Sequence, residues 1–182
     1  MEKMEIRMEL KELTEKMLDL LGISEVKDMP ERIFWVVRMN DTSVYTAFSQ
    51  MVPDLNIDWL QQIYQYYMAD RKEKMQDYTP KNLAQFMSKL AGDGDVITDL
   101  CAGSGALTIQ CWSRNNDQKF ELYEVDENVI PILLFNMAVR NIECIVCHAD
   151  VLQQEIYHTY QIKKGEKFGI FWEVENEKNA NL

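Results

Sequence analysis

The sequence predicts an α/β protein in which an all-helical segment precedes a sheet of about four parallel strands. Apolar side chains recur at helical intervals through residues 1–75. Beyond residue 90, short apolar runs rich in branched residues alternate with turns and helical stretches, which is typical of βαβ units. The 182 residues, 47% of them apolar, suffice for one globular domain and an accessory segment. We therefore divide the chain into a helical segment, 1–75, and an α/β core, 76–182.

The first two helices are predicted from apolar spacing and from their ends. Residues 2–21 form an amphipathic pattern that ends at Gly22. A second helix follows, which Ser24 or Asp28 can cap and in which Pro30 suits the first turn.

The rest of the helical segment begins with a predicted turn at 40–43. Residues 44–75 then hold two more helical stretches, which are broken near Pro53. We interpret the methionine and aromatic stripes of these helices as core.

The α/β core is predicted as alternating strands and helices joined by right-handed crossovers, which make the sheet parallel. A doubly wound order, 3-2-1-4, places the fourth strand on an open edge, and an apolar edge invites another strand. We therefore expect a homo-oligomer or a partner subunit bound through the strand-four edge, 168–173. The expected strands are 96–100, 120–125, 143–147 and 168–173, and the expected helices are 105–114, 127–139 and 151–160.

Composition excludes several classes of protein. The apolar run 129–134 is interrupted by Pro131 and is far shorter than the roughly 20 residues of a membrane helix. The N-terminus lacks the pattern of a signal peptide, so we expect a cytoplasmic protein with four reduced cysteines. Because the net charge is −11, we expect this chain alone to bind nucleic acid poorly.

A glycine-bearing turn joins the first predicted strand to its helix. Asp99 ends the strand, and residues 101–105 read Cys-Ala-Gly-Ser-Gly. Gly103 and Gly105 allow the backbone to approach a ligand closely. The third glycine of a dinucleotide-binding turn is replaced by Thr108, which disfavours a pyrophosphate site.

Two further acids follow at the next strand ends. Glu124 lies 25 residues after Asp99, where a carboxylate can accept both hydroxyls of a ribose. Asp150 ends the third strand and can accept from an adenine amino group. A glycine turn, a ribose acceptor and an adenine acceptor without a phosphate site fit S-adenosylmethionine, a nucleoside that lacks phosphates.

These motifs resemble those of the adenine-N6 DNA methyltransferases of the type I restriction-modification kind. The resemblance covers roughly 56 to 173. Residues 77–83 are similar to the family's Tyr-Thr-Pro entry segment, 99–105 to its glycine turn, 123–126 to its ribose-binding strand end, and 149–152 to its adenine-binding end. Residues 136–138 lie on a helix similar to the family's.

The resemblance implies a Rossmann-like methyltransferase core that depends on S-adenosylmethionine, and methyl transfer to adenine N6 in DNA. It implies that the entry segment folds over the methionine end of the cofactor and that Val125 packs on its adenine. The cofactor-binding residues that we predict are Tyr78, Thr79, Asp99, Cys101, Ala102, Gly103, Ser104, Gly105, Leu107, Glu124, Val125, Asp150 and Val151.

The sequence departs from the family at the catalytic loop. Family members carry Asn-Pro-Pro-Tyr/Phe after strand four, and its aromatic ring stacks on the flipped base. The corresponding positions here are 174–177, Val-Glu-Asn-Glu, and no proline occurs after Pro131. We therefore infer a cofactor-binding half without the catalytic half, and the catalytic residues stay unassigned.

Three hypotheses follow from this departure. The first is an S-adenosylmethionine-binding member of the methyltransferase family that is inactive alone. The second is a non-catalytic interaction or regulatory module that retains the scaffold, and the third is methylation of a protein or small molecule.

Cysteine and histidine spacing offers one further pattern. Residues 144–148 match the haem-attachment pattern C-x-x-C-H, but this segment reads as a buried strand. A closed zinc site needs four ligands, and His158 is the only other histidine. We expect neither haem nor metal.

Overall fold

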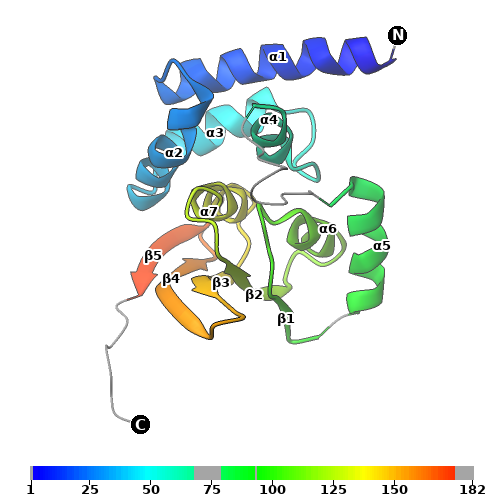
Figure 1. Ribbon diagram of the computed structural model, residues 1–182, viewed down its shortest axis with the longest axis vertical. Helices are drawn as coiled ribbons and strands as arrows, with labels where there is room; N and C mark the ends of the chain where they lie inside the picture. Colours follow the sequence, from blue (N-terminus) through cyan, green and yellow to red (C-terminus); the bar gives the residue numbers. More distant parts are fainter. Residues whose placement is uncertain (1, 68–78, 93, 175–182) are drawn as a thin grey trace.

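A five-stranded sheet carries helices on one of its faces in the computed structural model, which describes residues 2–67, 79–92 and 94–174 (Figure 1). The helices are α1 (Glu2–Leu21), η1 (Val26–Asp28, a 3-10 turn), α2 (Met29–Arg38), α3 (Thr42–Met51), α4 (Trp59–Tyr67), α5 (Lys81–Ala91), α6 (Ala106–Arg114) and α7 (Ile130–Val139). The strands are β1 (Val96–Asp99), β2 (Lys119–Glu124), β3 (Cys144–Asp150), β4 (Glu155–Lys163) and β5 (Ile170–Val174).

The helices predicted for the first part of the chain are confirmed as α1 to α4. Asp28 occupies the N-cap position of α2, although its side chain makes no capping hydrogen bond, and Pro30 lies in the first turn. The break expected near Pro53 falls between α3 and α4. None of the helices in the described ranges is long and apolar enough to cross a membrane.

Three neighbouring strands of the sheet are parallel. Ile97 of β1 is the register partner of Phe120 in β2, which in turn is the partner of Cys144 in β3. The carboxyl ends of β1, β2 and β3 therefore lie along the same edge of the sheet. This edge is where a doubly wound sheet holds its ligands.

The helix predicted over 151–160 is wrong, because residues 151–154 form a turn and residues 155–160 belong to β4. Tyr160 and Ile162 alternate with less buried residues and point toward the helices, where Tyr160 contacts Phe34 edge to face at 5.8 Å between ring centroids. Branched and aromatic side chains at every second position favour a strand over a helix.

The predicted order 3-2-1-4 and the count of four parallel strands are also wrong. The order is β1-β2-β3-β4-β5, only β1 to β3 are parallel, and β5 pairs antiparallel with β4. A connection of six residues, 164–169, joins β4 to β5. Such a short connection closes a hairpin, whereas a crossover to the far side of β1 needs a dozen or more residues.

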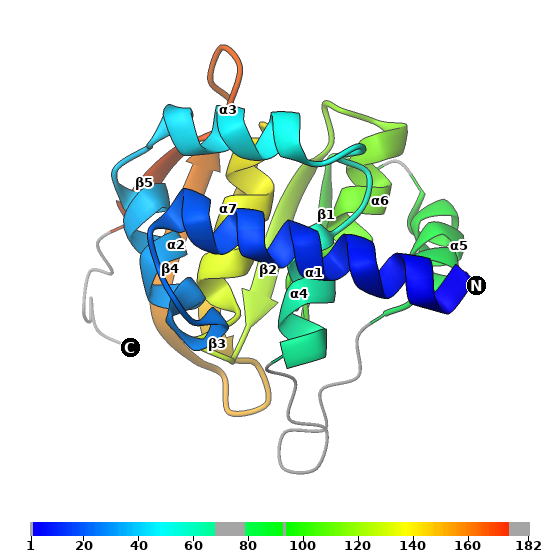
Figure 2. The ribbon, with the colours of Figure 1, turned by 90° about the horizontal axis from the view of Figure 1, so that it is seen from above.

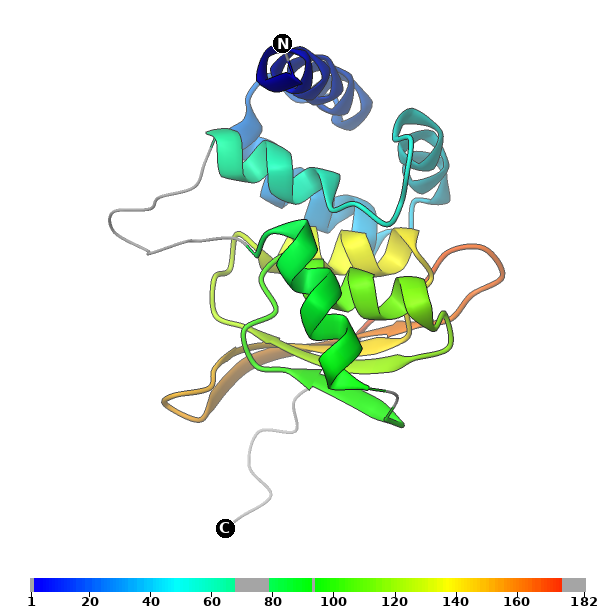
Figure 3. The same cartoon turned by 90° about the vertical axis from the view of Figure 1, so that its right-hand side faces the viewer.

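Helix α7 lies between the sheet and the N-terminal helices, and each of its residues is buried (Figure 2). The rings of Tyr45 and Phe48 on α3 meet Phe135 on α7 with centroids 5.3 and 5.2 Å apart. A single apolar cluster includes residues from both the predicted helical segment and the predicted α/β core. Helices α6 and α7 lie on the same face of the sheet (Figure 3).

Candidate functional site

The turn between β1 and α6 is held by a side-chain and a backbone hydrogen bond, both donated by amides of the turn. The Oδ1 atom of Asp99 accepts from the amide of Cys101 at 3.1 Å. The amide of Ala102 donates to the carbonyl of Tyr123 at 2.9 Å, which ties the turn to β2. The Cys101 side chain is exposed, whereas Ala102 and Ser104 are buried.

The two glycines of this turn serve different purposes. Both have a positive φ, +55° at Gly103 and +92° at Gly105. A Cβ atom at Gly105 would lie 2.7 Å from Cε of Met137 and 3.0 Å from Cδ1 of Leu133 on α7. A Cβ atom at Gly103 would meet nothing within 4 Å. Gly105 therefore permits helix packing, and Gly103 faces open space, where a ligand has access.

Glu124, the last residue of β2, joins the first two strand ends. Its Oε2 atom accepts from the amide of Gly103 at 2.8 Å, and Oε1 accepts from the amides of Val125 and Asp126 at 2.8 Å each. Since each carboxylate oxygen has two lone pairs, Oε2 retains capacity for another donor. The glycine turn and the predicted ribose acceptor thus lie in direct contact.

The end of β3 lies beside that of β2. His148 is the register partner of Glu124, and its Nε2 atom is 3.1 Å from the carbonyl oxygen of Val125. Asp150 follows two residues later, where its carboxylate accepts from the amides of Leu152 and Gln153 at 3.0 Å each.

The apolar residues predicted around the nucleoside differ in exposure. The side chain of Val125 is 56% exposed, and Val151 is half-buried. Leu107 is partly buried against the apolar core. Only Val125 of these three therefore offers a large exposed surface for an adenine ring to pack on.

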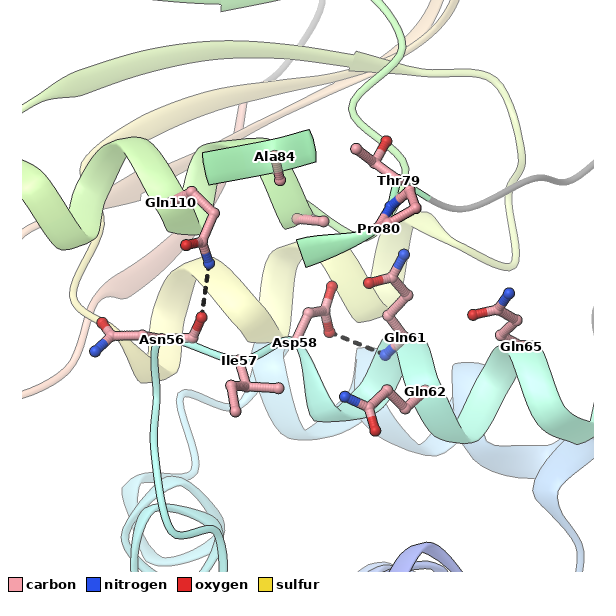
Figure 4. Close-up of a pocket in the computed structure, with 11 residues that line it drawn as sticks. Asn56, Ile57, Asp58, Gln61, Gln62, Gln65, Thr79, Pro80, Ala84 and Gln110 are labelled. Carbon is pink, nitrogen blue, oxygen red and sulfur yellow. Dashed lines mark hydrogen bonds between the residues drawn. The ribbon is translucent and has the colours of Figure 1, made fainter. Parts of the chain in front are cut away.

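A cavity of about 310 Å³ opens between α4, α5 and α6 (Figure 4). Thr79 lines it from the segment before α5, and Ala106, next to Gly105, lines it from the start of α6. The predicted entry segment and the first residue of α6, which follows the glycine turn directly, therefore border one cavity. Tyr78 lies outside the described residues.

A buried polar network behind the glycine turn was not predicted. Asn136 on α7 donates through Nδ2 to Oδ1 of Asp58 and to the carbonyl of Ser104, both at 2.9 Å. Arg140 donates to the side chain of Asn136 at 2.8 Å and to the carbonyls of Leu55 and Ile57 at 2.7 and 2.9 Å. The network fastens the start of α4 to the turn. Its sequence signal is a polar residue in an otherwise apolar helix, Asn136, followed four positions later by Arg140 at the C-cap of that helix.

Burial sets the electrostatics of this network and of the turn. It raises the pKa of Asp58 above the usual aspartate value, and the charge of Arg140 opposes the shift. Burial also lowers the pKa of Arg140 to about 10. At Asp99, burial raises the pKa and the hydrogen bond from Cys101 opposes it. Among the effects that lower the pKa of Asp58, the charge of Arg140 is the largest, ahead of hydrogen bonds from Ser104, Gln61 and Asn136.

The cysteine-rich segment lies within β3. Cys144 and Cys147 are buried, and burial raises the pKa of both thiols, which keeps them protonated at neutral pH. Among the described residues, no group of three or more histidine, cysteine, aspartate or glutamate side chains is arranged to hold a metal ion.

Comparison with known proteins gives one match. Residues 55–172 match the family model described as N-6 DNA methylase. The matched range agrees to within one residue at each end with the range of the resemblance. Searches of curated proteins and of solved structures found no match. The matched range includes Thr79, the glycine turn, Glu124 and Asp150.

Proposed function

Because the chain belongs to the N-6 DNA methylase family, we propose that it binds S-adenosylmethionine across the carboxyl ends of β1, β2 and β3. The contact between the amide of Gly103 and the carboxylate of Glu124, at 2.8 Å, carries this proposal. It joins the open glycine turn to the acid best suited to accept ribose hydroxyls. The bound cofactor supplies a methyl group on a positively charged sulfur.

The nucleoside half of the ligand has three groups to receive it. Oε2 of Glu124 accepts a ribose hydroxyl through its remaining lone pair. The exposed side chain of Val125 packs on the adenine ring, and Asp150 accepts from the adenine amino group. Neither acid requires a metal or phosphate partner for these contacts.

The methionine half lies toward Thr79 and the cavity beside Ala106. This cavity is lined mainly by polar side chains, including those of Asp58, Gln61 and Gln110. Amide and carboxylate groups are suitable partners for the amino and carboxyl groups of the ligand. The polar network of Asn136 and Arg140 holds this wall in place.

The family motif that would bind the methyl acceptor is not found in this sequence. Family membership favours adenine N6, but the sequence has no Asn-Pro-Pro-Tyr/Phe loop to accept from the amine and to stack on the base. A net charge of −11 also opposes binding to DNA. We therefore expect cofactor binding without methyl transfer to DNA by this chain alone.

Calorimetric titration of the full chain with S-adenosylmethionine, and with its demethylated product, tests the proposal. We expect a Kd of ~100 µM or tighter, and Glu124→Ala should weaken binding at least ~10-fold, since it removes a charged acceptor. Glu127→Ala is the matched control, because Glu127 is exposed three residues further on. Wild-type protein that binds neither ligand at millimolar concentration would favour the non-catalytic module instead.

A further inference from the structure

Helix α5 presents an apolar face to solvent. Its small residues Ala84 and Ser88 are buried, and the carbonyl of Ser88 accepts from Arg114 at the end of α6. The large apolar side chains at helical spacing instead lie 42–64% exposed; they are Leu83, Phe86, Met87 and Leu90. A monomeric protein rarely leaves so continuous an apolar stripe uncovered.

The strand next to this helix has an unpaired edge. In the described part of the chain, β1 pairs with β2 alone, so its other side presents free backbone donors and acceptors. Val96, the first residue of β1, and Leu100, the residue after its end, are 52% and 57% exposed. Figure 3 shows α5 and β1 on the same side of the molecule. We call this surface the β1–α5 face.

The opposite edge of the sheet is occupied. The side chain of Asn40 accepts from the amide of Phe171 at 2.7 Å and donates to the carbonyl of the same residue at 3.4 Å. Arg38 forms an ion pair with Glu173 at 3.4 Å. Because Asn40 takes the place of a neighbouring strand at the second residue of β5, pairing of β1 with β5 of another copy is obstructed.

Charge permits two copies to meet at the β1–α5 face. The chain as a whole carries a net charge of −11, which repels a second copy. Residues 81–100, however, contain two lysines and three aspartates. In the sequence, Lys89 precedes β1 by seven residues and Asp99 ends this strand. An antiparallel copy therefore brings Lys89 of each chain toward Asp99 of the other.

We propose that the β1–α5 face binds a second copy of this chain about a two-fold axis. The two β1 strands pair antiparallel, which extends the sheet across both copies, and the apolar faces of the two α5 helices cover one another. The same surface is used on each side, so the assembly closes at two subunits. The interface is small, with a four-residue strand and one helix face from each copy.

Sedimentation equilibrium of the full chain tests this proposal. We expect a dimer with a Kd of ~10 µM or tighter. The double variant Phe86→Glu, Leu90→Glu places like charges on both sides of the interface and should weaken association at least ~30-fold. Both positions are solvent-exposed, so circular dichroism and the midpoint of thermal unfolding should match the wild-type values.

The matched control is Trp172→Glu, which introduces the same charge at an exposed residue of β5 and should leave the dimer unchanged. A wild-type chain that stays monomeric at ~200 µM overturns the proposal. A dimer that withstands the double variant but dissociates with Trp172→Glu also overturns it, and moves the interface to the strand-four edge predicted from the sequence.

Discussion

Gly103 and Gly105 share one turn, but their surroundings make different demands on the residue. Gly105 approaches α7 so closely that an added Cβ atom meets Met137 and Leu133, whereas Gly103 borders open space. The spacing of the glycines along the sequence was sufficient to predict the turn. It was not sufficient to assign packing to one glycine and ligand access to the other, because Met137 and Leu133 lie on a helix that begins 25 residues later.

Alanine substitution should separate the two roles. Gly105→Ala should lower the free energy of unfolding by ~3 kcal/mol, since overpacking adds to the cost of a positive φ. Gly103→Ala should cost only ~1 kcal/mol, from backbone conformation alone. Urea unfolding of both variants measures the difference, and equal losses would contradict the packing assigned to Gly105.

Among the helices and strands, sequence patterns predicted the features that depend on residues close together in the sequence. The ends of the strands that carry Asp99 and Glu124 were predicted within one residue, and the end that carries Asp150 within three, because turns and acids next to each other in the sequence mark them. The position of β5 was not, because a strand assigned as a helix over 151–160 concealed the hairpin. The contact between Asp58 and Asn136 spans 78 positions, and no local pattern signals such a distance.

The buried network that fastens α4 to α7 should be essential for stability. Arg140→Met leaves the carboxylate of Asp58 buried without its opposing charge, and should lower the free energy of unfolding by ~3–5 kcal/mol. Adding Asp58→Asn to that variant removes the buried charge and should recover part of the loss. The exposed ion pair of Arg38 provides the control, since Arg38→Met should cost less than ~1 kcal/mol.

A double-mutant cycle measured by urea unfolding distinguishes the network from simple loss of packing. Coupling between the Arg140 and Asp58 substitutions is expected because the two side chains share Asn136 as a hydrogen-bond partner. Strictly additive losses would show that the two groups stabilise the fold independently and that the network does not act as a unit.

In the whole molecule, a single apolar core includes residues on both sides of the boundary at residue 75 that the spacing of apolar residues predicts. Helix α7 packs on the sheet below and on α2 and α3 above, so each part of the chain covers apolar surface of the other. Composition and charge vary little along the sequence, and they cannot show that the N-terminal helices complete the core of the α/β part.

The shared core predicts that neither part folds alone. A fragment of residues 76–182 exposes the face of Phe135 that Tyr45 and Phe48 cover, and should lack a cooperative thermal transition and native near-ultraviolet circular dichroism. Mixing it with a fragment of residues 1–75 should restore both signals. A sharp transition of the isolated 76–182 fragment would show that the α/β part is independently stable.

A crystal structure of the full chain grown with S-adenosylhomocysteine would locate the cofactor site without relying on any variant. We predict a ligand with its ribose hydroxyls within hydrogen-bond distance of the Glu124 carboxylate, its adenine against Val125 and its amino-acid end toward Thr79. A ligand bound elsewhere on the molecule, with Glu124 engaged only by the amides of Gly103, Val125 and Asp126, would contradict the proposed site.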